Sequence, residues 1–284
     1  MSETTQKTRE ISLGHSPDPD DAFMFDPLAQ HQIDTGGLSF RHILQDIQTL
    51  NERTMRGELD VSAVSIHAYP RVAANYALMP CGASMGDGYG PMVVASEPCD
   101  PKDLRRMTIA VPGTLTSAFL ALRLYLGEFN HIVIPFDQIF GAIRAGKVQA
   151  GLIIHEGQLT YEKEKLHRII DLGAWWKEDT GLPLPLGGNV IRKSLGPELV
   201  SKITAIVKQS ITHALRNTEE TIPRVMRYAR DLDLVLAKKF VRMYVNDYTL
   251  DYGEKGRAAI REFLERGRAA GMIREKFKLE FVEL

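Results

Sequence analysis

"TIAVPGTLTSAFLALRLYL", residues Thr108–Leu126, is the stretch of sequence that decides the fold. Thr108–Val111 is a short apolar run typical of a buried strand, and Pro112 with Gly113 then turns the chain. Leu115–Leu126 has the apolar spacing of a helix that buries one face. A strand, a tight turn and a helix in this order form the repeating unit of α/β folds.

The same unit recurs on both sides of this stretch. The strand-like segments are Ile11–Gly14, Leu38–Leu44, Val61–Ile66, Ile132–Phe136 and Ala150–Ile154. The helix-like segments between them are Ala22–Gln30, Ile47–Arg56, His67–Asn75 and Gln138–Ala145. This alternation predicts an α/β protein with mostly parallel sheet. After the strand-like Asn189–Arg192, four helical segments follow: Glu198–Arg216, Glu219–Arg230, Val235–Val245 and Lys255–Ala270.

The proline-bearing, charged segment "ASEPCDPKDLRR" at residues 95–106 resembles a linker between two sets of units. We therefore expect a two-lobed α/β fold. The larger domain comprises residues 9–100 and 190–284, with the C-terminal helices packing on the first lobe. The smaller domain comprises residues 101–189, and a ligand cleft lies between the two.

Composition excludes several classes of function. The chain has 284 residues, 44% of them hydrophobic, and a net charge of −1. No basic run predicts nucleic-acid binding, and no long apolar segment predicts a signal peptide or a membrane span. Cys81 and Cys99 lack metal-type spacing and are typical of reduced thiols, so we expect a cytoplasmic protein. The sequence leaves a homodimer open.

Polar residues follow four of the expected strands. They are "HSPDPDD" (15–21), "HAY" (67–69), "PGTLTSAF" (112–119) and "HEG" (155–157). In open α/β sheets, ligands bind beyond the carboxyl ends of strands, so we expect these segments to share the cleft. Histidines occur in three places, yet no HxH or HxxxH spacing supports a metal site, and we predict none.

Thr114, Thr116 and Ser117 stand at the start of a predicted helix. Unpaired backbone N–H groups at a helix N-terminus favour a negatively charged ligand, and the hydroxyls add donors. We expect Thr114 or Thr116 to cap the helix. Thr116, Ser117 and Ala118 are then candidates to hold a carboxylate or phosphate of a small anionic substrate.

Asp18, Asp20 and Asp21 open another predicted helix, where carboxylates commonly cap N–H groups. Three carboxylates exceed what capping requires. One of them could face the cleft, binding a substrate hydroxyl or assisting a base.

His155 ends an apolar strand, and a neutral imidazole there can accept a proton near neutral pH. The alternative for His155 is a partly buried ring that fills space and forms hydrogen bonds. Glu156 points away from it if the strand geometry continues.

Six motifs carry a resemblance that runs from about residue 11 to residue 270. They are "SPDPDDAFMF", "GYGPMVVAS", "AVPG" with "TSAF", "AGLIIHEGQLTY", "DLGAWWKEDTGLPLPLGG" and "YVNDYTLDYGEKG". In this order they resemble the 1,4-dihydroxy-6-naphthoate synthases of the futalosine route to menaquinone. The resemblance implies a fold like that of type II periplasmic binding proteins. It also implies a cytoplasmic lyase that cleaves cyclic dehypoxanthinylfutalosine, which carries a carboxylate, without a metal or an organic cofactor.

The resemblance also implies roles for particular residues. The general base of the family matches His155, and its substrate-contacting segments match Ala63–Ser65, including Val64, and Ser117–Ala118. The chain departs from the family at Asp18 and Asp20, where neutral cysteine and asparagine are more common. It departs again at Ala63, where lysine is often found. A chorismate-dehydratase-like enzyme and a non-catalytic solute-binding protein of the same fold are the alternatives.

Overall fold

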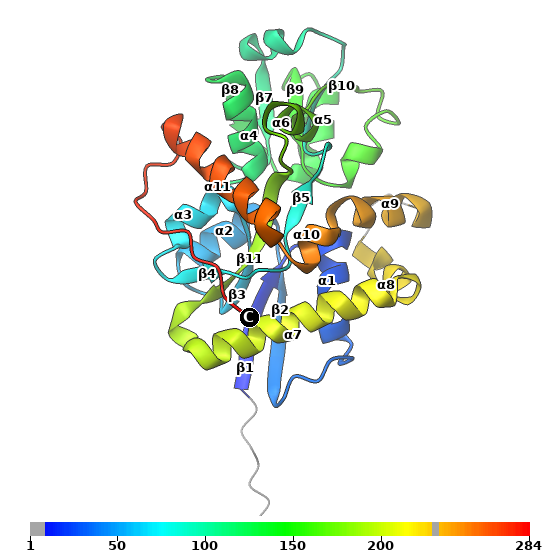
Figure 1. Ribbon diagram of the computed structural model, residues 1–284. Coiled ribbons are helices and arrows are strands. Elements are labelled where there is room, and N and C mark those ends of the chain that lie inside the picture. Colours follow the sequence, from blue (N-terminus) through cyan, green and yellow to red (C-terminus); the bar gives the residue numbers. More distant parts are fainter. Residues whose placement is uncertain (1–8, 229–232) are drawn as a thin grey trace, which may run out of the picture.

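The computed structural model describes residues 9–228 and 233–284. Two mixed sheets form the cores of two lobes (Figure 1). The first sheet has the order β2-β1-β3-β11-β4, and β5 also pairs with β11. Its strands are β1 (Arg9–His15), β2 (Leu38–Leu44), β3 (Val61–Ser65), β4 (Tyr76–Leu78), β5 (Ser84–Gly86) and β11 (Leu184–Arg192).

The second sheet has the order β10-β6-β9-β7-β8. Its strands are β6 (Met92–Ala95), β7 (Thr108–Val111), β8 (Asn130–Val133), β9 (Ala150–Ile153) and β10 (His167–Asp171). The α/β two-lobed fold class is confirmed, but the sheets are mixed rather than mostly parallel. Pairs β1–β2, β1–β3, β7–β8 and β7–β9 are parallel. Strands β6 and β11, the first strands after each change of lobe, run antiparallel to their neighbours.

The lobe boundaries fall earlier than the sequence indicates. The chain leaves the first sheet after β5 and enters the second at β6, within residues 86–92 rather than near residue 100. It returns between β10 and β11, within residues 171–184 rather than near residue 189. The linker-like charged segment lies inside the second lobe, where it forms the 3₁₀ helix η2 (Pro101–Arg106).

Helices cover both sheets. Before β11 they are α1 (Pro19–Ala29), α2 (Ile47–Met55), α3 (Tyr69–Val72), α4 (Ser117–Leu126), α5 (Ile139–Arg144) and α6 (Leu172–Thr180). The C-terminal helices are α7 (Pro197–Arg216), α8 (Thr218–Val225), α9 (Leu234–Tyr244), α10 (Asp247–Leu250) and α11 (Gly253–Ala269). The remaining 3₁₀ helices are η1 (Ile66–Ala68), η3 (Phe136–Gln138), η4 (Glu156–Leu159), η5 (Lys193–Leu195) and η6 (Met226–Tyr228). The end of the predicted helix Glu219–Arg230 lies outside the described residues.

The C-terminal helices return to the first lobe, as the sequence predicts. Ile203, Val207, Ile211 and Ala214 recur at helical spacing on α7 and are fully buried, so α7 packs its apolar face along α1. Helices α8 and α9 also pack on α1, and Figure 1 shows α7 lying across the lower lobe. The fold therefore brings residues beyond 230 next to the first helix of the chain.

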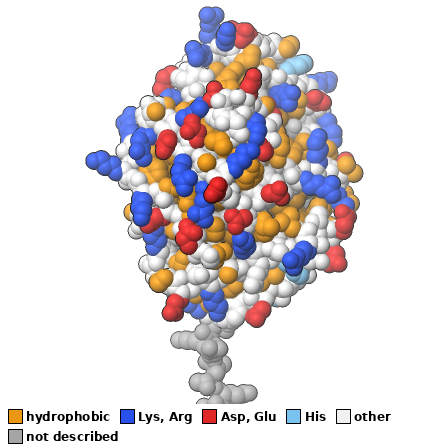
Figure 2. Space-filling model, viewed as in Figure 1, with side chains coloured by type: hydrophobic (Ala, Val, Ile, Leu, Met, Phe, Trp, Pro, Cys, Tyr) orange, Lys and Arg blue, Asp and Glu red, His pale blue; other side chains and the backbone are white. Residues whose placement is uncertain are grey.

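On the face shown in Figure 2, positively and negatively charged side chains are interspersed and form no large patch of a single charge. None of the helices in the described part of the chain is long and apolar enough to span a membrane.

Candidate active site

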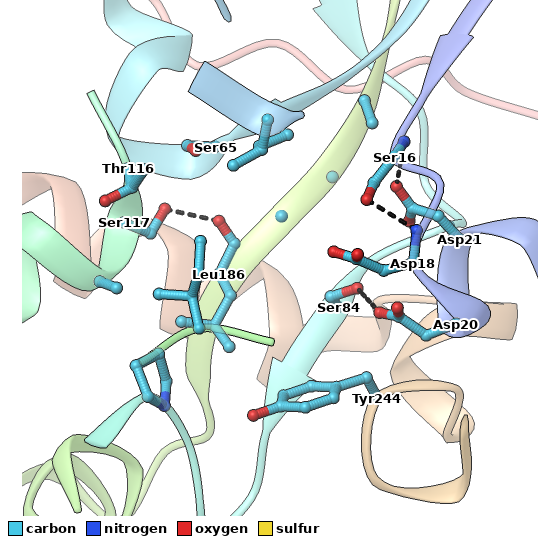
Figure 3. Close-up of a pocket in the computed structure, with 18 of the residues that line it drawn as sticks. Ser16, Asp18, Asp20, Asp21, Ser65, Ser84, Thr116, Ser117, Leu186 and Tyr244 are labelled. Atoms are coloured by element: carbon cyan, nitrogen blue, oxygen red, sulfur yellow. Dashed lines mark hydrogen bonds between the residues drawn. The ribbon is translucent and has the colours of Figure 1, made fainter. Parts of the chain in front are cut away.

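A cavity of about 110 Å³ lies between the two lobes. Its lining comes from the ends of β1 and β3, from β11, and from the starts of α1 and α4. Hydroxyl groups occupy one side and carboxyl groups the other, as Figure 3 shows for Ser65, Thr116 and Ser117 opposite Asp18 and Asp20. The cleft thus presents two chemically different walls, which we call the hydroxyl wall (Ser65, Thr116, Ser117 and Ala118) and the carboxyl wall (Ser16, Asp18, Asp20, Asp21 and Ser84).

The hydroxyl wall begins with the N-terminus of α4. Thr116 caps this helix, since its Oγ1 accepts a hydrogen bond from the backbone N–H of Phe119 at 3.1 Å. The backbone N–H groups of Ser117 and Ala118 meet no acceptor within residues 9–228 and 233–284. Both residues line the cavity. Two unpaired donors at the positive end of a helix dipole form a seat for an anion.

The Ser117 hydroxyl links the lobes. It donates to the Leu186 carbonyl of β11 at 2.5 Å and accepts from the backbone N–H of His67 at 3.2 Å. The His67 ring also contacts α4, with Nδ1 3.2 Å from the Thr116 carbonyl oxygen. The start of α4 is therefore fixed against the first lobe from two sides, so its free N–H groups have a defined direction.

Ser65 extends the hydroxyl wall from β3. The buried side chain of Asn51 donates to Ser65 Oγ at 3.0 Å and accepts from Ser65 N at 2.8 Å. This bonding leaves the Ser65 hydroxyl hydrogen for an acceptor in the cavity. Ala63 also lines the cavity, two residues earlier on the same face. The side chain of Val64 points to the opposite face and packs in the core.

The carboxyl wall consists of the loop before α1 and its first turn. Asp18 is the N-cap residue but makes no side-chain capping bond, and Asp21 instead accepts from the Ser16 backbone N–H at 2.9 Å. Asp20 accepts from Ser84 Oγ at 3.3 Å and is 9% exposed. All three carboxyl groups line the cavity.

Burial makes two of these carboxyl groups, those of Asp20 and Asp21, unusually basic. Burial first, and then the charge of Asp18, raises the pKa of Asp20 to about 7. Burial and the neighbouring Asp20 raise the pKa of Asp21 well above its ordinary value. The carboxyl wall can therefore hold protons near neutral pH, and a protonated carboxyl can donate a hydrogen bond.

His155 lies beside the cavity rather than in its lining, although Ile154 does line it. Its Nδ1 accepts from the Gly157 backbone N–H at 3.0 Å, and its Nε2 lies 3.2 Å from the Phe136 carbonyl oxygen. The first bond requires a lone pair on Nδ1, so in the neutral ring the proton is on Nε2. The rings of Phe136 and Phe140 pack on His155 at centroid distances of 5.2 and 6.1 Å. Both ring nitrogens are therefore engaged by the backbone.

Two aromatic residues of α9 complete the cavity and were not predicted from the sequence. Phe240 and Tyr244 line the cavity and are buried. The Tyr244 hydroxyl donates to Gln158 Oε1 at 2.6 Å, and Figure 3 shows its ring below the carboxyl wall. The spacing of these residues indicates only an apolar helix face, which by itself does not distinguish core packing from a ligand contact.

The three histidines that follow strands do not come together. His15 bonds to His42, with 3.1 Å between Nε2 and Nδ1, whereas His67 contacts α4 and His155 contacts the η3 turn. In the part of the chain that the structure describes, no group of three or more His, Cys, Asp or Glu side chains is arranged to hold a metal ion.

Two α/β lobes around a cleft define a periplasmic-binding-protein-like fold. Solved structures share this fold at low identity. One is the alkanesulfonate-binding protein SsuA from Xanthomonas axonopodis pv. citri, with a TM-score of 0.71 and 11% identity over 97% of this chain and 98% of that chain. The likeness to this protein shows the fold alone.

Residues 11–269 match the model of the family described as "Menaquinone biosynthesis", and the chain belongs to this family. The 1,4-dihydroxy-6-naphthoate synthase of Streptomyces coelicolor is 39% identical over 93% of this chain and 94% of its own length. The enzyme of the same name from Thermus thermophilus is 36% identical over 92% and 95%. The crystal structure of protein AF1704 from Archaeoglobus fulgidus is 42% identical, with a TM-score of 0.89 over 93% of this chain and 98% of that chain.

Proposed function

We propose that the protein is a cytoplasmic 1,4-dihydroxy-6-naphthoate synthase of menaquinone biosynthesis, acting as a carbon–carbon lyase on cyclic dehypoxanthinylfutalosine. Relatives that carry this enzyme name match more than nine-tenths of the chain. The observation that carries the proposal is the two-walled cavity, whose unpaired N–H groups at Ser117 and Ala118 face buried carboxyl groups. A substrate with a carboxylate at one end and hydroxyls at the other suits this arrangement.

The two walls orient such a substrate. Its carboxylate binds at the N-terminus of α4, where the N–H groups of Ser117 and Ala118 and the hydroxyl of Ser65 supply donors. Its sugar-derived hydroxyls bind the carboxyl wall, where Asp20 accepts a hydrogen bond when ionised and donates one when protonated. The bicyclic ring then lies between the walls, against Phe240 and Tyr244. Fixing both ends holds the scissile bond in one place and lowers the entropy cost of reaction.

In the reaction, neutral His155 takes a proton from the substrate. The electron pair left behind forms a new π bond as the carbon–carbon bond to the sugar-derived fragment breaks. The product that keeps the electrons of the broken bond takes the proton back from His155, so the fragment leaves as the bicyclic ring becomes aromatic. Because Nε2 of the neutral ring carries the proton and bonds to Phe136 O, only Nδ1 can accept a proton, and it must first leave the Gly157 N–H. Before this movement the base lies beside the cavity, next to the lining residue Ile154, and not in the lining itself.

Incubating the purified protein with cyclic dehypoxanthinylfutalosine tests this proposal. We expect 1,4-dihydroxy-6-naphthoate to form, as followed by chromatography. His155→Asn should lower kcat by about 100-fold or more, which is the usual contribution of a general base. His167→Asn serves as the control because His167 is exposed on β10, and it should retain full activity.

Two outcomes would contradict the proposal. Tight binding of the substrate without turnover by the wild-type protein would indicate a non-catalytic binding protein of the same fold. Full activity in His155→Asn, with an unchanged melting temperature, would remove His155 from the role of base.

A further inference from the structure

The turn that carries His155 is held by a helix of the other lobe. η4 (Glu156–Leu159) follows β9 in the second sheet, whereas α9 packs on α1 in the first lobe. The hydroxyl of Tyr244 on α9 donates to Gln158 Oε1 at 2.6 Å, and both residues are 3% exposed. This buried hydrogen bond therefore crosses between the lobes at the edge of the cavity, on the side away from Ser117 (Figure 3). We call this bond the clasp.

Gln158 connects the clasp to His155. The backbone N–H of Gln158 donates to the His155 carbonyl at 3.0 Å, and its Nε2 donates to the Ile153 carbonyl at 3.4 Å. The backbone N–H of the preceding residue, Gly157, donates to His155 Nδ1. A displacement of Gln158 therefore moves the turn that bonds the imidazole.

Tyr244 is itself held in place. Its ring packs edge-on against Tyr89 and Phe240, with centroid distances of 5.9 and 5.2 Å. The Tyr89 hydroxyl donates to the carbonyl of Met243, the residue before Tyr244. Burial raises the pKa of Tyr244 well above its ordinary value, so its hydroxyl keeps the proton that it donates to Gln158. The donor side of the clasp is thus a fixed part of the first lobe.

We propose that Tyr244 is a positioning residue for His155: by donating to Gln158 across the cleft, it sets the place of the η4 turn. The inference rests on the proposed function, in which His155 is the base. The bond ties the η4 turn to the first lobe in the arrangement that the structure describes.

Three variants test the clasp. Tyr244→Phe removes the donor, Gln158→Met removes the acceptor at similar size, and Gln158→Glu keeps an acceptor oxygen. We expect each of the first two to lower kcat by about 10- to 100-fold, because a displacement of about 1 Å costs this much, with KM changed by less than about 3-fold. The double variant Tyr244→Phe/Gln158→Met should be no slower than the slower single variant, since the two residues act through one bond. Gln158→Glu should restore most of the rate.

Tyr161→Phe is the matched control. Tyr161 lies three residues beyond Gln158, and its hydroxyl bonds only to the neighbouring Glu162 among the described residues. This variant should leave kcat unchanged. Multiplicative losses in the double variant, or a Tyr244→Phe variant with the wild-type kcat, would overturn the proposal.

Amide hydrogen exchange gives a second readout that does not depend on catalysis. In the wild-type protein, the amides of Gly157 and Gln158 are protected by their bonds to His155. Tyr244→Phe and Gln158→Met should raise their exchange rates about 10-fold or more, whereas Tyr161→Phe should not. Unchanged exchange would overturn the clasp. If the wild-type protein forms no product, the proposed function fails, and the exchange measurement alone decides whether Tyr244 holds the turn.

Discussion

At the scale of the residue, Asp20 shows how burial changes the chemistry of a common side chain. It lies in the first turn of α1 and accepts a hydrogen bond from the side chain of Ser84. Burial and the charge of Asp18 raise its pKa to about 7, so near neutral pH both protonation states are populated. An asparagine, the residue more common at this position in the resembled family, would offer a fixed donor and acceptor. The sequence identifies Asp20 as a candidate, but the pattern alone does not show its burial or its contact with Ser84.

Asp20→Asn should stabilise the protein, and more so at higher pH. Because the folded-state pKa of Asp20 lies above its ordinary value of 3.8, the folded protein binds more protons than the unfolded chain between about pH 4 and pH 7. Wild-type stability therefore falls as pH rises through this window and stays lower above it. Asparagine buries no charge, so the gain in unfolding free energy should be small at pH 4.5 and reach on the order of 4 kcal/mol at most at pH 8.

Urea unfolding of the wild type and the variant at both pH values measures this gain. Asp137→Asn, at an exposed position, is the control and should change stability by less than about 0.5 kcal/mol at either pH. A gain for Asp20→Asn that is equal at pH 4.5 and pH 8 would contradict the burial of a charged Asp20.

At the scale of the element, strands followed by capped helices were predicted well. Leu38–Leu44 and Thr108–Val111 have the predicted bounds. The first shows the alternation of a strand, and the second is an apolar run that ends at Pro112 and Gly113. β4 and β5 were not predicted as strands, since three residues are too few to show a period of two. β10 was also missed, because its pairing with β6 depends on a contact between segments more than 70 residues apart. The local sequence pattern therefore predicts the strand–helix units but not the short strands between them.

The N-terminus of α4 allows the backbone donor to be tested separately from the side chain. Ser117→Ala removes the hydroxyl but keeps the N–H, whereas Ser117→Pro removes both. Proline suits the first helical position, and Thr116 before it has the extended backbone that proline requires (φ −71°, ψ 147°). We expect KM for the substrate to rise in both variants, and about 10-fold more in Ser117→Pro than in Ser117→Ala. Only Ser117→Pro loses the backbone N–H and its charge-assisted hydrogen bond to the carboxylate.

Steady-state kinetics with melting temperatures measured in parallel separates binding from folding in these two variants. Equal KM values in Ser117→Ala and Ser117→Pro would show that the N–H of Ser117 does not bind the substrate.

At the scale of the whole molecule, the site depends on contacts that no local pattern contains. Tyr244 is more than 80 residues from Gln158 in sequence, yet the two share the clasp because α7, α8 and α9 fold back along α1. The sequence places His155 at a strand end, as observed, but not the backbone bonds that occupy its ring. The general position of a cleft residue follows from strand order, whereas its orientation follows from packing between lobes.

Two buried histidines of the first lobe, His15 and His67, make the packing of the protein sensitive to acid. Burial lowers the pKa of His15 and of His67 to about 4, below the ordinary value of 6.5. The unfolded chain therefore binds more protons than the folded protein between about pH 4 and pH 6.5. The contribution of these two neutral rings to the free energy of unfolding is complete above pH 6.5 and is lost as pH falls toward 4. For Asp20 the free energy of unfolding instead falls as pH rises.

His67→Asn should make the protein less sensitive to acid. Lowering the pH from 6.5 to 5 costs about 2 kcal/mol for each buried imidazole that must stay neutral, so the variant should lose about 2 kcal/mol less than the wild type over this range. At pH 7 it should be less stable than the wild type, since the bond from His67 to the Thr116 carbonyl holds the two lobes together. Urea unfolding at pH 5, 6.5 and 7 measures both effects. Parallel losses in the variant and the wild type would show that His67 takes up its proton in the folded protein as readily as in the unfolded chain.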